Sequence, residues 1–271
     1  MGILSGFAQE ANFSYTDDNG VTWGGYVGYD YDTQKNEVRI NTTSSNSEEE
    51  VVIPDEISYA GEKYKVTKLG SVFSGNKIIE KVTIPKTVTS LSSTFSGCSA
   101  LSEVVNTNQL KSVYYAFNNC SSLKSIDLSS CEILGSGSFG GCSQLENVVL
   151  KVCKRIASSA FSNYGGSNSC SKLKSVGDIS LCESIGEYAF GYCRSLTSVD
   201  LSSCKTLGSN SFSSCSALVS VGSTKLLTNI PNSAFEFCSN LKNVDLSNCT
   251  SVGSSAFQGC SKIKHLNISV Q

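Results

Sequence analysis

The amino-acid sequence predicts a mostly β solenoid, in which short coils stack into a parallel β ladder behind an N-terminal β cap. Phenylalanine recurs at steps of 22 residues, apart from one step of 29 and one of 23, and a fixed period of this size indicates stacked copies of one small unit. Gly and Ser dominate the connections and leave too little chain for long helices. The recurring residues are Phe73, Phe95, Phe117, Phe139, Phe161, Phe190, Phe212, Phe235 and Phe257.

Residues 1–10 precede both the cap and the repeat. Small residues at Gly6 and Ala8 follow an apolar start and lie ahead of a polar segment, which resembles the tail of an export signal. The alternatives are a signal-peptide remnant, with an exported product beginning near Gln9, and an expression leader.

Residues 11–65 are expected to form the N-terminal β capping region. Turn residues at 17–20 precede a strand-like stretch at 21–27, and a second turn near Asp30 precedes a further strand at 38–40. The segment also holds the only tryptophan and several tyrosines. Because a solenoid exposes apolar surface at its ends, a divergent terminal segment of this kind is expected to cover the first coil.

Residues 66–271 are expected to form the solenoid, of about nine units of 22–23 residues. Leu123-x-x-Ile126-x-Leu128 alternates as a strand does, and stacked strands would place successive coils about 4.8 Å apart. Extra residues between Phe161 and Cys170 predict a surface loop, and glycines after Val176 and Val221 predict bulges. We expect the last strand either to be open for end-to-end pairing with a second copy or to be followed by more chain.

The thirteen cysteines fall into two columns of the repeat. One column precedes the strand leucine by three residues, and Asn76 takes its place in the first unit, which suggests side chains that hydrogen-bond the turning backbone. The other column alternates with Val and Leu in other units, as a small buried hydrophobe would. Buried free thiols are therefore favoured over disulfides, because stacked Cβ atoms are about 4.8 Å apart and a disulfide needs about 3.8 Å. Zinc is disfavoured because no CxxC occurs.

Composition and motifs argue against several classes of function. A net charge of -2 with 16% charged residues gives no electrostatic basis for binding nucleic acid, and no apolar run is long enough for a membrane span. His265 is the only histidine and has no nucleophile motif beside it. Asp30-Tyr31-Asp32 faintly resembles a calcium loop, although the required glycine and spacing are missing and a hairpin turn is favoured. We expect no enzyme activity, no catalytic residue, no metal and no cofactor.

The repeat Phe-x-x-Cys-x-x-Leu-x-x-Ile-x-Leu resembles the BspA-type leucine-rich repeat of surface proteins from anaerobic bacteria and some protists. The segments at 51–54 and 61–67 are also similar to the lead-in of these repeats. The resemblance implies a right-handed curved solenoid, secreted or exported to the cell surface, in a family associated with adhesion to host proteins or other cells. The sequence departs from the pattern where later units have Leu-Ser in place of Ile84-Pro85, and where Asn106 and Ser223 take strand positions that are usually apolar.

The outward strand positions are the candidates for partner binding. Charges of both signs along one face predict either a recognition surface or a merely soluble sheet in which neighbouring coils relieve each other's charge. The favoured function is a non-enzymatic binding protein that recognises a host or neighbouring-cell protein or glycan. The alternative is a structural spacer or surface-layer component without its own ligand, and a third is an enzyme using carboxylates of the N-terminal β region. The candidate residues are Lys124, Asp127, Glu146, Lys174, Thr197, Asp200, Lys242 and Asp245, with Lys264 beyond them.

Overall fold

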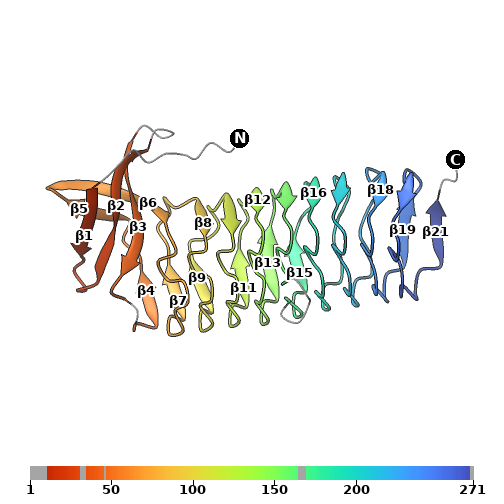
Figure 1. The fold of residues 1–271 in the computed structure, drawn as a ribbon, viewed down its shortest axis with the longest axis horizontal. Coiled ribbons are helices and arrows are strands. Elements are labelled where there is room, and N and C mark those ends of the chain that lie inside the picture. The colour runs from red at the N-terminus through yellow and green to blue at the C-terminus, as the bar shows by residue number, and fades with distance from the viewer. Residues whose placement is uncertain (1–10, 31–34, 46, 164–168, 269–271) are drawn as a thin grey trace.

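A computed structural model describes residues 11–30, 35–45, 47–163 and 169–268 and confirms the solenoid. Figure 1 shows coils standing side by side in one row, with the N-terminal strands at one end and β21 at the other. Across the described residues the secondary structure consists of strands and turns, without a helix. The proposed leader, the centre of the turn that follows Asp30 and the centre of the insertion after Phe161 lie outside the described residues.

A five-stranded sheet in the order β1-β2-β3-β6-β5 precedes the coils. Its strands pair antiparallel except for β3 and β6, and the predicted turn at 17–20 joins β1 to β2. Trp23 is fully buried, donates its Nε1–H to Asp17 Oδ2 at 2.9 Å, and contacts the Phe73 ring edge to face at 6.5 Å. Trp23 therefore covers the first ring of the coil interior. The strands are β1 (Ala11–Thr16), β2 (Thr22–Asp30), β3 (Lys35–Thr43), β5 (Glu56–Tyr59) and β6 (Glu62–Leu69).

The first ladder is the one that the alternating pattern predicts. Its strands pair in parallel from coil to coil, and the outward residues alternate with buried ones, as at Ser125-Ile126-Asp127. It appears as three sheets rather than one continuous sheet. The strands are β4 (Glu50–Val52), β7 (Lys81–Thr83) and β9 (Glu103–Val105); β11 (Ser125–Asp127), β13 (Asn147–Leu150) and β15 (Ser175–Gly177); and β19 (Asn243–Leu246) and β21 (His265–Ile268).

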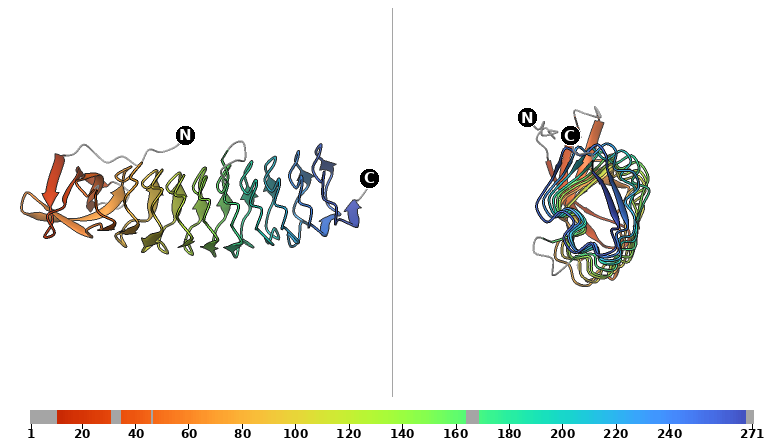
Figure 2. Two further views of the ribbon diagram at one scale, coloured as in Figure 1. Left: turned by 90° about the horizontal axis from the view of Figure 1, so that it is seen from below. Right: turned by 90° about the vertical axis from the view of Figure 1, so that its right-hand side faces the viewer.

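Each coil also contributes to a second ladder, where the sequence pattern predicts only a turn. These strands are two or three residues long, too short to show alternation, and a single apolar residue such as Leu134 points inward from each of them except β20, whose Val252 is exposed. Figure 2 shows the two ladders on a common closed outline when the coils are viewed end-on. The strands are β8 (Ser90–Ser92), β10 (Ser112–Tyr114), β12 (Ile133–Leu134), β14 (Arg155–Ile156), β16 (Ser184–Ile185) and β17 (Thr206–Leu207), followed by β18 (Asn229–Ile230) and β20 (Ser251–Val252).

Phenylalanine rings fill the interior in one stack, as predicted. From Phe73 to Phe257 each ring is stacked on the next, with centroids 5.0–5.7 Å apart and interplanar angles of 17° or less. All but the last ring are buried. Since a buried aromatic side chain contributes about 1.5–3 kcal/mol by burial alone, this stack is a principal source of stability.

The cysteines are buried and free, apart from Cys260, which is free and half-buried. In the first column each thiol donates to the carbonyl of the phenylalanine one coil earlier, as from Cys98 to Phe73 at 3.0 Å and from Cys142 to Phe117 at 3.0 Å. Asn76 Oδ1 accepts instead from two backbone N–H groups, which confirms that this column satisfies the turning backbone. Burial raises the pKa of these thiols, so they stay protonated at neutral pH.

The predicted bulge at Gly177 is also present. The pairing of β13 with β15 shifts register there, and Gly177 has a φ of +73°. A Cβ at this position would lie 2.6 Å from the Leu150 carbonyl oxygen, so both the conformation and the close approach require glycine.

Candidate binding surface

The predicted binding residues project outward from the first ladder in two columns. Lys124, Glu146 and Lys174 occupy equivalent positions in three successive coils, and the backbone N–H groups of the second and third donate to the carbonyl of the coil before at 2.8 Å. Thr197 and Lys242 continue this column in later coils, whereas Asp127, Asp200 and Asp245 form the other column near the ends of the strands. All eight are exposed or half-buried. The structure therefore spreads them along the solenoid and does not gather them into one site.

Charges in the first column partly satisfy one another. Lys174 Nζ lies 2.6 Å from Glu146 Oε2 of the adjacent coil. The hydrogen bond and charge of Lys174 lower the pKa of Glu146, and Lys124 contributes a smaller effect. This stretch thus shows the mutual relief of charge that a merely soluble face would have.

The aspartates of the second column serve the backbone. Asp127, Asp200 and Asp245 each accept a hydrogen bond through Oδ1 from the backbone N–H two residues later, at 2.9, 2.9 and 3.0 Å. These Asx turns redirect the chain as it leaves the strand. Hydrogen bonds to Ser247 correspondingly lower the pKa of Asp245. Reversing these charges would therefore disturb the turns as well as the surface.

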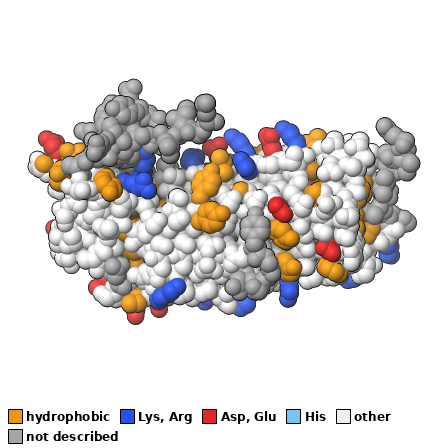
Figure 3. All heavy atoms as spheres, viewed as in Figure 1, with side chains coloured by type: hydrophobic (Ala, Val, Ile, Leu, Met, Phe, Trp, Pro, Cys, Tyr) orange, Lys and Arg blue, Asp and Glu red, His pale blue; other side chains and the backbone are white. Residues whose placement is uncertain are grey.

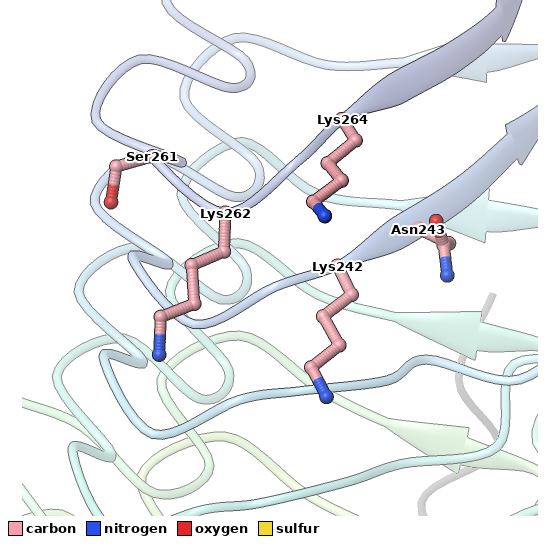
Figure 4. A pocket seen from close by; sticks show the side chains of 5 residues that line it. All are labelled: Lys242, Asn243, Ser261, Lys262 and Lys264. Atoms are coloured by element: carbon pink, nitrogen blue, oxygen red, sulfur yellow. The ribbon is translucent and has the colours of Figure 1, made fainter.

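Three lysines meet around a surface depression of about 430 Å³ at the last two coils. Figure 4 shows Lys242 and Lys264 side by side where the chain enters β19 and β21, with Lys262 on the adjoining loop and all three side chains extending in the same direction. Lys262 Nζ donates to Asn240 Oδ1 at 2.6 Å. Within the described residues none of the three forms an ion pair, in contrast to Lys174. Asn243 and Ser261 complete the lining.

Sequence reasoning found two of these lysines and missed the third. Lys242 and Lys264 belong to the strand pattern, whereas Lys262 lies on the turn before the strand, where no periodic feature marks it. Only the packing of one coil on the next brings it to the same depression.

A second set of charges was also missed, because it lies on the second ladder. Five consecutive coils place alternating charges at one outward position, with Glu132 and Lys154 3.0 Å apart and Glu183 and Lys205 2.7 Å apart. Aligning the coils would have revealed the alternation. Exposed pairs of this kind contribute little to stability, although opposite charges on neighbouring strands favour the native register over a shifted one. The column is Lys111, Glu132, Lys154, Glu183 and Lys205.

Searches for other chemistry over the described part of the chain gave two negative findings. No group of three or more His, Cys, Asp or Glu side chains is arranged to hold a metal ion there. Nor does that part contain a helix with the length and apolarity to cross a bilayer.

Comparison with known protein families supports the assignment of the repeat. A sequence model described as "BspA type Leucine rich repeat region (6 copies)" matches residues 67–181 and again residues 167–271. The chain has the architecture of a β solenoid built from leucine-rich repeats, and it belongs to the BspA-type leucine-rich repeat family. No curated protein matches it.

Solved structures of leucine-rich repeat proteins are among those similar to this chain. A leucine rich cell surface protein from Faecalibacterium prausnitzii A2-165 is 20% identical, with 97% of each chain covered and a TM-score of 0.45. A leucine rich repeat protein from T. pallidum is 20% identical, with 88% of this chain and 87% of that chain covered and a TM-score of 0.46. The pneumococcal vaccine antigen PcpA is 15% identical, with 95% and 82% covered and a TM-score of 0.49.

Proposed function

We propose that this protein is a non-enzymatic binding module, exported to the cell surface, that recognises a host or neighbouring-cell protein or glycan through the first ladder. Membership of the BspA-type family supports the surface location. The long, regular stack supports recognition over many weak contacts, because solenoids present extended surfaces rather than one deep pocket.

The cluster of Lys242, Lys262 and Lys264 is the observation that carries this proposal. Lysines such as Lys154, Lys174 and Lys205 are paired with a glutamate of a neighbouring coil, whereas here like charges lie on adjacent coils with no carboxylate paired to them among the described residues. Like charges directly opposite each other are destabilising. An anionic group of a partner would offset that repulsion, so the expected partner carries carboxylate or sulfate groups.

The test uses the purified chain against defined panels of matrix proteins and of sulfated, sialylated and neutral glycans. We expect Lys242→Thr with Lys264→Thr to weaken capture of an acidic partner at least tenfold and to reduce its dependence on salt. Threonine already occupies this column at Thr197, so the fold should tolerate the change. Lys205→Thr, on the second ladder, is the matched control and should bind as the parent does. Equal binding by the double variant would contradict the proposal.

The aspartate column needs a different substitution. Asn at positions 127, 200 and 245 keeps the side-chain oxygen that accepts the turn hydrogen bond and removes only the charge. If these carboxylates contact the partner, the triple variant loses binding while its unfolding transition stays in place.

A structural spacer is the second candidate, favoured by charge pairs on the outer face such as Glu146–Lys174. A spacer predicts no effect of the lysine substitutions but a loss of reach when one whole coil is deleted. Association between copies through the last coil is a separate expectation, because β21 would accept another strand on the edge away from β19. Sedimentation at increasing protein concentration would detect it.

A further inference from the structure

Exposed aromatic residues occupy backbone positions that disfavour them. In the turn around each buried phenylalanine, the residues two before and two after it commonly have a positive φ, and most coils use Gly, Asn or Ser there. Tyr115, Tyr188, Tyr192 and Phe237 hold these positions with φ between +49° and +62°. Bulky side chains are rare in the left-handed region for steric reasons, and such outliers concentrate at functional sites.

Tyr188 and Tyr192 are half-buried, but burial does not explain Tyr115 and Phe237. Tyr115 is 51% exposed and Phe237 48%, and Tyr114 beside the former is 40% exposed. Side chains that stay this open contribute little to the core. Figure 3 shows hydrophobic side chains in separate groups along one face of the coils.

Glycines in the following coil make room for the rings. A Cβ at Gly137 would lie 2.5 Å from Cδ1 and Cε1 of Tyr115, and one at Gly135 would lie 2.1 Å from Cδ1 of Tyr114. Gly259 is covered in the same way by Phe237, at 2.5 Å from Cδ1. Each ring therefore has one side against the backbone of the next coil and remains open to solvent elsewhere. The two tyrosines, adjacent in the chain, form what we call the tyrosine platform (Tyr114 and Tyr115 over Gly135 and Gly137).

Uncharged hydrogen-bonding groups surround the tyrosine platform. Tyr114 is paired with Ser92 in the second ladder, its carbonyl accepts from Ser93 N–H at 2.9 Å, and Tyr115 N–H donates to the Ser136 carbonyl at 3.1 Å. Asn118 Nδ2 lies 3.4 Å from the Gly137 carbonyl oxygen of the next coil. These neighbours supply hydroxyl and amide groups without net charge, unlike the lysines at the last two coils.

We propose that the tyrosine platform is a binding site for a neutral oligosaccharide. An open aromatic face is electron-rich and attracts the weakly positive C–H groups on one side of a pyranose ring, while Ser and Asn side chains exchange hydrogen bonds with its hydroxyl groups. The neighbouring groups named above carry no net charge, which disfavours an acidic partner. The platform also presents its rings at little conformational cost, because the glycines already fix where they lie. This site is separate from the lysine cluster and does not depend on the function proposed for it.

The test replaces the platform with residues that the fold already uses at the same positions. Ser92 is the register partner of Tyr114, and Ser93 and Ser159 adopt the left-handed conformation of Tyr115 in other coils, so Tyr114→Ser with Tyr115→Ser should fold normally. Binding of neutral hexasaccharides of glucose, mannose and N-acetylglucosamine would be measured by calorimetry. We expect the parent to bind at least one of them and the double variant to lose at least tenfold in affinity, with a melting temperature close to that of the parent because serine already adopts these backbone conformations in other coils.

The matched control is Tyr26→Ser, which removes a tyrosine of similar exposure, 43%, from β2. It should bind as the parent does. Failure of the parent to bind any neutral hexasaccharide, or equal binding by the platform variant, would overturn the proposal. Binding that is restricted to sulfated or sialylated glycans and lost with the lysine variants would also overturn it, while leaving the function proposed for the first ladder intact.

Discussion

Raising the pH above about 9 should unfold the solenoid, because its interior is lined with thiols that cannot ionise while buried. In the unfolded chain a cysteine has a pKa of about 8.5. Burial raises the pKa of Cys98 and Cys204 to about 11 and that of Cys131 and Cys182 to about 12. Folded chains therefore retain protons that unfolded chains release. The stabilisation is complete below the unfolded pKa and falls as the pH rises toward the folded values.

The loss of stability at high pH is large because several buried thiols contribute to it. At pH 10 each thiol with a folded pKa of 11 or more costs about 2 kcal/mol of unfolding free energy. Together these four cost about 8 kcal/mol, comparable with the 5–15 kcal/mol total for an ordinary domain. Circular dichroism during a base titration in the presence of a reductant would follow the transition, with return to pH 7 to check reversibility.

The sequence itself supplies the control. Cys131, Cys182 and Cys204 occupy a column that other coils fill with Val66 or Val88, so Val at all three positions should preserve packing and remove three of the titrating groups. The alkaline midpoint of this triple variant should move to higher pH. An unchanged midpoint, with both proteins folded at pH 7, would show that thiol burial does not govern the alkaline transition.

Two further predictions concern the core and the N-terminal sheet. Phe190→Ala removes a buried ring whose centroid lies 5.0 Å from each of its two stacked neighbours, and it should lower the free energy of unfolding in urea by about 3–5 kcal/mol. Phe257→Ala removes a half-buried ring with one stacked neighbour and should lower it clearly less. Equal losses in the two variants would contradict the stack as a source of stability. Asp17→Ala leaves the buried Trp23 Nε1–H without its acceptor and should cost about 1–3 kcal/mol, with a change in tryptophan fluorescence. An unaltered spectrum and stability in this variant would argue against that hydrogen bond.

The spacing of residues predicted the first ladder, the phenylalanine stack and the thiol columns. Each inward side chain contacts the side chain at the same position of the next coil, so a period in the sequence becomes a column of side chains in the structure. For the same reason Asn76 could be recognised as a member of the first cysteine column, and its two backbone hydrogen bonds confirm that assignment. The bulge at Gly177 followed from one glycine placed after a strand residue.

Outward positions were predicted less well, because exposure follows from the period whereas interactions depend on which side chain of the adjacent coil lies opposite. Asp127 is exposed as expected, yet its carboxylate holds a turn, and Glu146 is paired with Lys174. The two-residue strands of the second ladder were missed because they are too short to alternate.

What the sequence alone determined is the repeated coil and its interior, since a strict period and a narrow choice of buried residues leave one way to stack the units. Only the tertiary structure decided the surface: that Lys262 joins Lys242 and Lys264, and that glycines about 22 residues further along the chain lie beneath Tyr114 and Tyr115. These contacts depend on the turn conformations and on the register between coils, which bring together side chains that no local pattern relates.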